Sequence, residues 1–385
     1  MNPLVRAIGG SLIREIAAKR KAGSIDLGLG EPSLPPTMKY LTAALQRAQV
    51  EALRYTVNAG DPELREMIAE HYAYPDYTHA NNVCMMTGSQ EAVYVAIKTL
   101  LDPAKDQMLL VEPAFPAYAK MARLEGVELR TVAMEEKADF AFDAQRILEA
   151  VTERTRLIVF CSPSNPTGRV MHKSAAEELA AALLRRSGEP IYVLHDEIYR
   201  EQTYIDDPGH MAAVYPHTIV TNSLSKSNAL TGLRLGWTLA PHSIAEAIVK
   251  AHAWVTSAAS TFAQWVAFEI FRTPGALREH AAWYREQCSA AVGVLNASGF
   301  RYVTPEGSFY ACIALPEGIS SLTAAHELAD RFDVIAIPGI AFGERFEGWL
   351  RLSWVGPIDQ LREGLSRIQE LCSAETGRAA EVQRR

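Results

Sequence analysis

The 385-residue sequence has few cysteines, no excess of positive charge and no long run free of polar residues. Its five cysteines are scattered, and no two have C-x-x-C spacing, so neither a disulfide framework nor a redox pair is expected. Lysine and arginine number 38 against 45 aspartates and glutamates, which gives a net charge of −7. This balance argues against nucleic-acid binding through a basic face. We therefore expect reduced cysteines, a cytoplasmic location and no nucleic-acid partner.

Membrane and metal sites are not expected either. Residues 251–268 contain no Asp, Glu, Lys or Arg, yet Thr256, Ser257 and Gln264 among them make a membrane span too polar, so we predict a buried helix there. Charged residues interrupt the first twenty positions, which is unlike a signal peptide. The histidines do not occur in H-E-x-x-H spacing, so we predict no metal site.

Short apolar runs alternate with helix-like stretches through the middle of the chain. The predicted strands cover residues 83–87, 108–111, 157–160, 191–194, 219–221 and 235–239. Most of these runs precede a helical pattern, which is typical of a mostly parallel sheet with helices on both faces. We therefore predict an α/β fold whose large domain covers residues 27–270.

The two ends of the chain have helical periodicity instead. Near the amino terminus, apolar residues recur every fourth position, at Leu4, Ile8, Leu12 and Ile16. Near the carboxyl terminus, Pro357 fits the first position of a helix whose apolar face includes Leu361, Leu365 and Ile368. We predict a smaller α+β domain that combines residues 1–26 with residues 271–385.

Reactive and polar side chains follow the ends of the predicted strands, where open α/β sheets bind ligands. Lys226 could form a Schiff base with an aldehyde, and Asp196 could keep a pyridine nitrogen protonated. Phe115 could stack on such a ring. Backbone amides after Gly88 and the guanidinium of Arg234 could bind a phosphate. Together these are the groups that a phosphorylated pyridine aldehyde requires.

Five ordered segments carry a resemblance to a known family. Residues 223–237, SLSKSNALTGLRLGW, resemble the lysine signature of the class I/II aminotransferases, which are fold type I pyridoxal-phosphate enzymes. The other segments are GLGEP at 28–32, SPSNPTG at 162–168, HDEIY at 195–199 and RLS at 351–353. The resemblance implies pyridoxal 5′-phosphate as cofactor. It also implies transfer of an amino group between an L-amino acid and a 2-oxo acid through a Lys226 Schiff base.

The same resemblance implies a role for each matching residue. The implied catalytic residues are Lys226, Asp196 and Tyr199. The implied cofactor-binding residues are Gly88, Ser89, Gln90, Phe115, Asn165, Asp196, Tyr199, Ser223, Ser225, Lys226, Arg234 and Tyr55. The implied substrate-binding residues are Gly30, Asn165 and Arg351. Because Tyr55 would reach the phosphate of a neighbouring subunit, a homodimer with shared active sites is expected.

Other functions remain open at this point. A lyase that catalyses β-elimination, decarboxylation or cyclisation would use the same cofactor and scaffold. Ser223 and Lys226 also fit the S-x-x-K motif of acyl-transfer hydrolases, although the companion motifs S-D-N and K-T-G do not occur. A nucleotide hydrolase is excluded, because the sequence has no G-x-x-x-x-G-K-[ST] loop.

Overall fold

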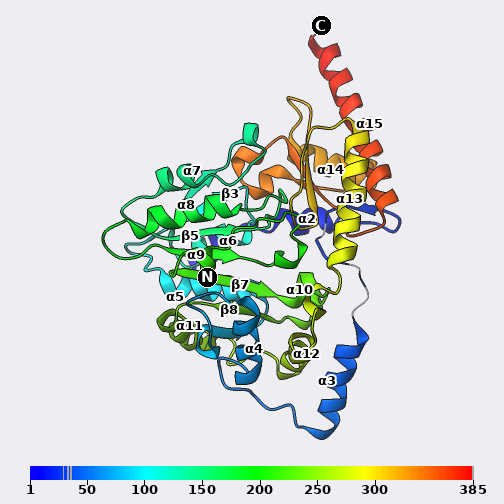
Figure 1. The fold of residues 1–385 in the computed structure, drawn as a ribbon. Helices are drawn as coiled ribbons and strands as arrows, with labels where there is room; N and C mark the ends of the chain where they lie inside the picture. The colour runs from blue at the N-terminus through cyan, green and yellow to red at the C-terminus, as the bar shows by residue number, and fades with distance from the viewer. Residues whose placement is uncertain (29, 33, 35–36, 384–385) are drawn as a thin grey trace.

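The computed structural model describes residues 1–28, 30–32, 34 and 37–383 (Figure 1). Within them, a seven-stranded sheet forms the centre of the molecule. In spatial order its strands are β2 (Val83–Met86), β8 (Gly236–Leu239), β7 (Thr218–Ser223), β6 (Tyr192–Asp196), β5 (Thr155–Cys161), β3 (Gln107–Glu112) and β4 (Glu128–Ala133). Only β8 runs antiparallel to its neighbours. The predicted α/β class with a mostly parallel sheet is therefore confirmed.

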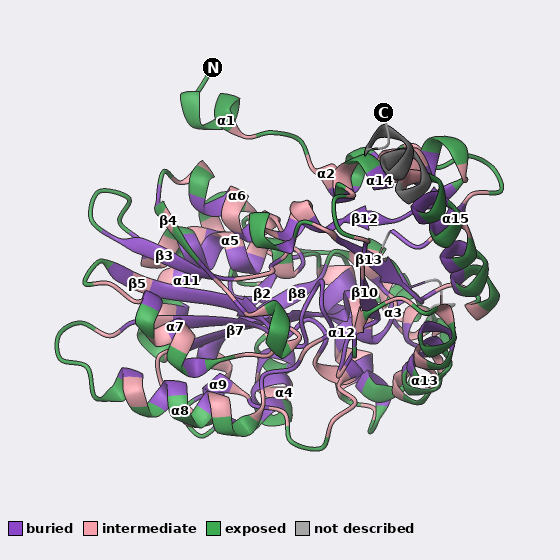
Figure 2. Cartoon of the chain, turned by 90° about the horizontal axis from the view of Figure 1, so that it is seen from above, coloured by how far each residue is buried: buried purple, intermediate pink, exposed green. Residues whose placement is uncertain are grey.

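Helices cover both faces of this sheet, which explains why its inner strands are buried along almost their whole length. Figure 2 shows α5 and α6 on one side of the sheet and α7, α8 and α9 on the other. Helix α11 packs against α5. Their bounds are α5 (Ser89–Leu100), α6 (Ala117–Leu124), α11 (His242–Val255), α7 (Ala144–Ala150), α8 (Lys173–Leu184) and α9 (Met211–Val214). At the β2 edge lie α3 (Met38–Val50), α4 (Pro62–Tyr72) and α12 (Thr261–Phe271).

A second, antiparallel sheet lies in the carboxyl-terminal part of the chain. Its strands, in spatial order, are β12 (Ile337–Pro338), β13 (Trp349–Ser353), β10 (Tyr310–Ala314) and β9 (Tyr302–Val303). The helices of this region are α13 (Ala281–Ser298), α14 (Ser321–Arg331) and α15 (Ile358–Gln383). A short parallel pair, β1 (Ile25–Asp26) and β11 (Val334–Ile335), ties the amino-terminal segment to this region. The division into residues 27–270 and the two chain ends stays a prediction that this pairing supports.

Two helix predictions are wrong. The apolar repeat near the amino terminus predicted one helix, but it is divided between α1 (Pro3–Ala7) and α2 (Leu12–Ala17). Gly9 and Gly10 lie between them, and glycine opposes a continuous helix. Residues 251–268 do not form one helix either, since α11 ends at Val255 and α12 begins at Thr261. In the part of the chain that the structure describes, no helix has the length and apolar character needed to cross a membrane.

Candidate active site

Lys226 lies just past the carboxyl end of β7, on the short helix α10 (Leu224–Ser227). Its ammonium nitrogen donates a 2.6 Å hydrogen bond to the backbone carbonyl of Gly30. Burial lowers the pKa of Lys226 to about 8, and the positive charges of Arg351 and Arg234 lower it as well. The uncharged amine that a nucleophilic lysine requires is therefore far more populated near neutral pH than in an exposed lysine.

Asp196, at the end of β6, has a carboxylate fixed by three donors. The Tyr118 hydroxyl donates to Oδ2 at 2.6 Å, and Thr221 Oγ1 donates to Oδ1 at 3.0 Å, as does the Ile198 amide at 3.3 Å. Thr221 is the register partner of Asp196 on β7, so sheet pairing places its hydroxyl here. Burial raises the pKa of Asp196 to about 6. A cationic partner would offset the cost of burying this carboxylate.

Arg351, on β13, is a buried cation that forms no ion pair with any described residue. One terminal nitrogen donates to Asn165 Oδ1 at 3.0 Å, and the other donates to the carbonyl of Gly28. Its Nε has no hydrogen-bond partner within the described residues. Burying an unpaired charge costs several kcal/mol, roughly, so the site favours an anionic ligand. A carboxylate has the geometry that a guanidinium binds best.

A phosphate-type site lies at the amino terminus of α5. Gly88 caps this helix with φ +83°, and Ser89 and Gln90 form its first turn. A Cβ at Gly88 would lie 2.5 Å from a terminal nitrogen of Arg234, so the guanidinium would have to move away, and the φ of +83° itself favours glycine. Arg234 forms no ion pair within the described part of the chain. Free helix amides and a guanidinium together suit a phosphate.

Ser223 and Ser225 lie beside Lys226 and are buried, and the Ser225 amide donates to Ser223 Oγ at 3.1 Å. Lys226 donates to the Gly30 carbonyl instead, and no contact links Ser223 Oγ to its ammonium among the contacts of the described residues. A serine nucleophile would need an adjacent base in hydrogen-bond reach. The arrangement therefore does not favour the S-x-x-K acyl-transfer reading.

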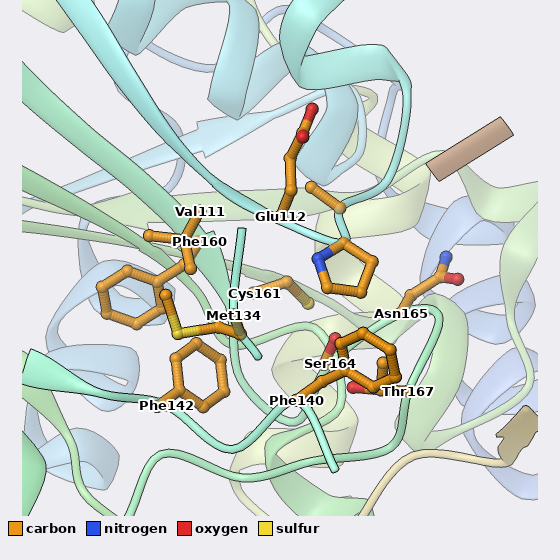
Figure 3. Close-up of a pocket in the computed structure, with 12 residues that line it drawn as sticks. Val111, Glu112, Met134, Phe140, Phe142, Phe160, Cys161, Ser164, Asn165 and Thr167 are labelled. Atoms are coloured by element: carbon orange, nitrogen blue, oxygen red, sulfur yellow. The ribbon is translucent and has the colours of Figure 1, made fainter. Parts of the chain in front are cut away.

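Three further predicted residues lie against these groups. Phe115 packs edge-on against Tyr118, the donor to Asp196, with ring centroids 5.8 Å apart. The hydroxyl of Tyr199 lies 3.2 Å from that of Tyr310. Asn165 accepts the hydrogen bond from Arg351 and borders a small cavity, across from the rings of Phe142 and Phe160 (Figure 3).

Tyr55 is the predicted site residue that lies apart from this cluster in the isolated chain. Its side chain is 89% exposed, in the segment between α3 and α4. Gln90 is also exposed, although its position in the first turn of α5 is beside Gly88. Arg351 lies in the middle of β13, and Gly30 lies in the segment whose carbonyl contacts Lys226. The remaining predicted residues lie at or just beyond the strand and helix ends described above. Within the described residues, no group of His, Cys, Asp and Glu is arranged to hold a metal ion.

Sequence reasoning missed three contributors to the site. Tyr118 and Thr221 bind Asp196, and Tyr310 contacts both Tyr199 and Arg351. Tyr118 follows Phe115 by three residues, so a helical turn there brings both side chains to one face. Thr221 precedes Ser223 by two residues on a strand, which also gives a shared face. These spacings were signals available in the sequence.

The chain resembles known proteins over almost its whole length. The family described as aminotransferase class I and II matches residues 22–368. An aspartate aminotransferase of Pyrococcus horikoshii is 33% identical over 95% of both chains. A probable N-acetyl-LL-diaminopimelate aminotransferase of Bacillus subtilis is 32% identical over 96% of this chain and 95% of its own. An aromatic-amino-acid aminotransferase of Thermococcus litoralis is 27% identical, covering 91% and 92%.

Solved structures agree with these matches. An aspartate aminotransferase of Thermus thermophilus, with maleate, has a TM-score of 0.88 at 28% identity, over 95% of this chain and 98% of its own. The aspartate aminotransferase of Thermotoga maritima has a TM-score of 0.88 at 26% identity, over 97% and 100%. The fold and the chain length are thus shared with enzymes of one family.

Proposed function

This chain belongs to the class I and II aminotransferases, and from that premise we infer the roles of its site residues. As a member of that family it is a pyridoxal 5′-phosphate-dependent enzyme that moves an amino group between an amino acid and a 2-oxo acid. The family match favours this reaction over the lyase and acyl-transfer alternatives. What remains to be assigned is which side chain performs each task.

The cofactor fits the donor set of the site. When bound, pyridoxal phosphate withdraws electrons from the substrate α-carbon and so makes its proton removable. Lys226 would bind the aldehyde carbon and, once released, carry the proton at its Nζ. Asp196 would keep a proton on the pyridine nitrogen, which in turn offsets the burial that raises its own pKa. Tyr199 and Asn165 would donate to the ring oxygen, and Phe115 would cover the ring.

The remaining roles concern the two anionic ends of the ligands. We propose that Ser89, Gln90, Ser223, Ser225 and Arg234 hold the phosphate, with Gly88 allowing the close approach. Arg351 would hold the substrate α-carboxylate with two hydrogen bonds, and the segment at Gly30 would lie over it. The observation that carries this proposal is the buried Arg351 guanidinium, which has an unpartnered Nε and no ion-pair partner among the described residues.

An acidic amino acid is our proposed donor. The support is that relatives from Pyrococcus horikoshii, Pyrococcus abyssi and Streptomyces avermitilis are named aspartate aminotransferases. Loss of the bound cofactor's visible absorbance on addition of aspartate, glutamate, aromatic and neutral amino acids would rank the donors. Aspartate or glutamate should react fastest, and faster reaction of an aromatic donor would contradict the substrate proposal alone.

Chemical labelling tests the Lys226 assignment. Borohydride reduction of the protein with bound cofactor should attach the cofactor covalently to Lys226, which serves as the label. Lys226→Ala should fold, carry no covalent label and lose nearly all turnover. Lys173 is an exposed lysine on α8, and Lys173→Ala should label and turn over as the unchanged protein does. A label on another lysine, or the absence of visible absorbance with cofactor, would overturn the assignment.

The homodimer is likewise a proposal, and its support is an exposed apolar surface. Val50 is exposed at the end of α3, Leu53, Tyr55 and Val57 are exposed in the segment after it, and Trp254 near the end of α11 is 93% exposed. A second copy of the chain that covered this surface could bring Tyr55 to its partner's phosphate site. A cytoplasmic location is also proposed, on the support of five free, buried cysteines.

A further inference from the structure

Tyr310 lies directly under the guanidinium of Arg351. The strands β10 and β13 pair Tyr310 with Ser353 and Cys312 with Arg351, so Tyr310 and Arg351 are diagonal neighbours on one face of the sheet. The guanidinium carbon lies 4.3 Å from the centroid of the Tyr310 ring, and 5.2 Å from that of Phe342. Aromatic faces therefore hold this buried cation where an acid partner would otherwise be expected.

This arrangement matters because of what Arg351 is proposed to bind. An aspartate or glutamate beside Arg351 would neutralise it and compete with the substrate carboxylate. An aromatic face attracts the cation without supplying a carboxylate oxygen, so the hydrogen-bonding edge of the guanidinium stays available. The unpartnered Nε of Arg351 is consistent with an edge kept for a ligand.

The hydroxyl end of Tyr310 contacts two other parts of the proposed site. It lies 3.2 Å from the Tyr199 hydroxyl, and a Cβ at Gly30 would overlap it. Burial raises the pKa of both phenols, so each keeps its proton. Two hydroxyl groups share one hydrogen bond and thus have one proton left over. If Tyr310 donates to Tyr199, the Tyr199 proton is free to be donated to the cofactor.

We propose that Tyr310 is a positioning residue that aligns the carboxylate-binding Arg351 with the ring-oxygen donor Tyr199. Its ring fixes the guanidinium and its hydroxyl directs the proton of Tyr199. Both effects rest on the proposed function of Arg351 and Tyr199. The packing of its hydroxyl against Gly30 also ties the segment over the site to the same side chain.

Two substitutions separate the two effects. Tyr310→Phe keeps the ring, so KM for amino acids should stay within about twofold of the unchanged protein. It removes a donor to Tyr199, which weakens the hydrogen bond from Tyr199 to the ring oxygen and disfavours the deprotonated state of the bound cofactor. The pH midpoint of the cofactor's visible absorbance should then rise by up to about one unit.

Tyr310→Leu removes the ring as well. The same upward shift of the midpoint should appear, together with a KM increase of about tenfold for every amino acid, because the guanidinium loses its aromatic support. The dissociation constant of an amino acid analogue with methyl in place of the α-hydrogen should increase to the same extent, which measures carboxylate binding without turnover. Tyr310→Met serves this purpose if the leucine variant does not fold.

Tyr302 offers a matched control, since it lies on β9 of the same sheet and its hydroxyl donates to Asn296. Tyr302→Phe should change neither the absorbance midpoint nor KM. If folded Tyr310→Phe and Tyr310→Leu also change neither quantity, Tyr310 has only a packing role and the proposal is wrong. Failure of the proposed function is distinguishable, because Lys226 would then carry no borohydride label in the unchanged protein.

Discussion

The buried carboxylate of Asp196 destabilises the cofactor-free protein near neutral pH. Burial raises the pKa of its carboxyl from 3.8 to about 6. A carboxyl with a raised folded-state pKa binds more protons in the folded than in the unfolded protein between these values. Its contribution to the free energy of unfolding therefore falls as pH rises from about 4 to about 6.

Asp196→Asn should consequently stabilise the cofactor-free protein at pH 7, by about 2–3 kcal/mol at most, and the difference should vanish near pH 4. Chemical denaturation of both proteins across this pH range measures it. With cofactor present the same substitution should lower kcat, because the pyridine nitrogen loses its counter-charge. A cofactor-free variant that is less stable than the unchanged protein at pH 7 would contradict this account of the Asp196 pKa.

At the scale of elements, the amino terminus of α5 depends on one glycine. Gly88→Ala would force a Cβ to within 2.5 Å of the Arg234 guanidinium, at a φ of +83° that other residues rarely adopt. Backbone strain of this kind costs about 1–3 kcal/mol. We expect cofactor affinity to fall by about tenfold or more, because Arg234 and the helix amides no longer meet.

Gly232 provides the control, since it lies two residues before Arg234 and a Cβ there would meet no atom within 4 Å. Gly232→Ala should leave the cofactor dissociation constant almost unchanged, as measured by titration of the cofactor-free protein. Equal affinities for the Gly88 and Gly232 variants would show that the phosphate binds elsewhere.

The central strands could be predicted because their apolar runs are continuous, as burial on both faces requires. The edge strand β4 could not, since half of its residues are exposed and half are polar. The break in the amino-terminal helix was predictable in principle from Gly9 and Gly10, but the four-residue repeat outweighed them. The spacing of apolar residues indicates which face of a helix is apolar, but not whether the helix is interrupted.

Site residues were predictable where a motif fixed them to a strand end, as for Lys226 and Asp196. Tyr310 was not, because its role depends on the register between β10 and β13, which brings it to Arg351 from 41 residues away in the chain. For Tyr118 and Thr221 the spacing to Phe115 and Ser223 within one element was a signal, but their contact with Asp196, on another strand, was not. Contacts between separate elements carry no spacing signal in a single sequence.

At the scale of the whole molecule, several of the exposed apolar residues lie in the segment after α3 and at the end of α11. The backbone carbonyl of Arg54 accepts a hydrogen bond from Thr261, and the Asn58 amide donates to the carbonyl of Ser257. These bonds hold the segment after α3 beside the connection between α11 and α12, at one end of the molecule (Figure 1). Exposed Leu53 and Tyr55 therefore lie on a segment bonded to the connection that follows Trp254, and we propose that a second copy of the chain covers this surface.

If the cofactor site is shared across that surface, association and cofactor binding must be linked, because a ligand that binds only the dimer stabilises it. Trp254→Glu should convert the protein to monomers and release the cofactor at the same time. Sedimentation across a dilution series, recorded at the visible absorbance of the cofactor, measures both effects. Leu184→Glu introduces the same charge at an exposed apolar residue on α8 and should do neither. Tyr55→Phe should keep the dimer but weaken cofactor retention by about tenfold, since it removes one donor to a charged phosphate. Monomers of the Trp254 variant that keep full cofactor occupancy and turnover would show that each chain completes its own site, and Tyr55 would then be an ordinary surface tyrosine.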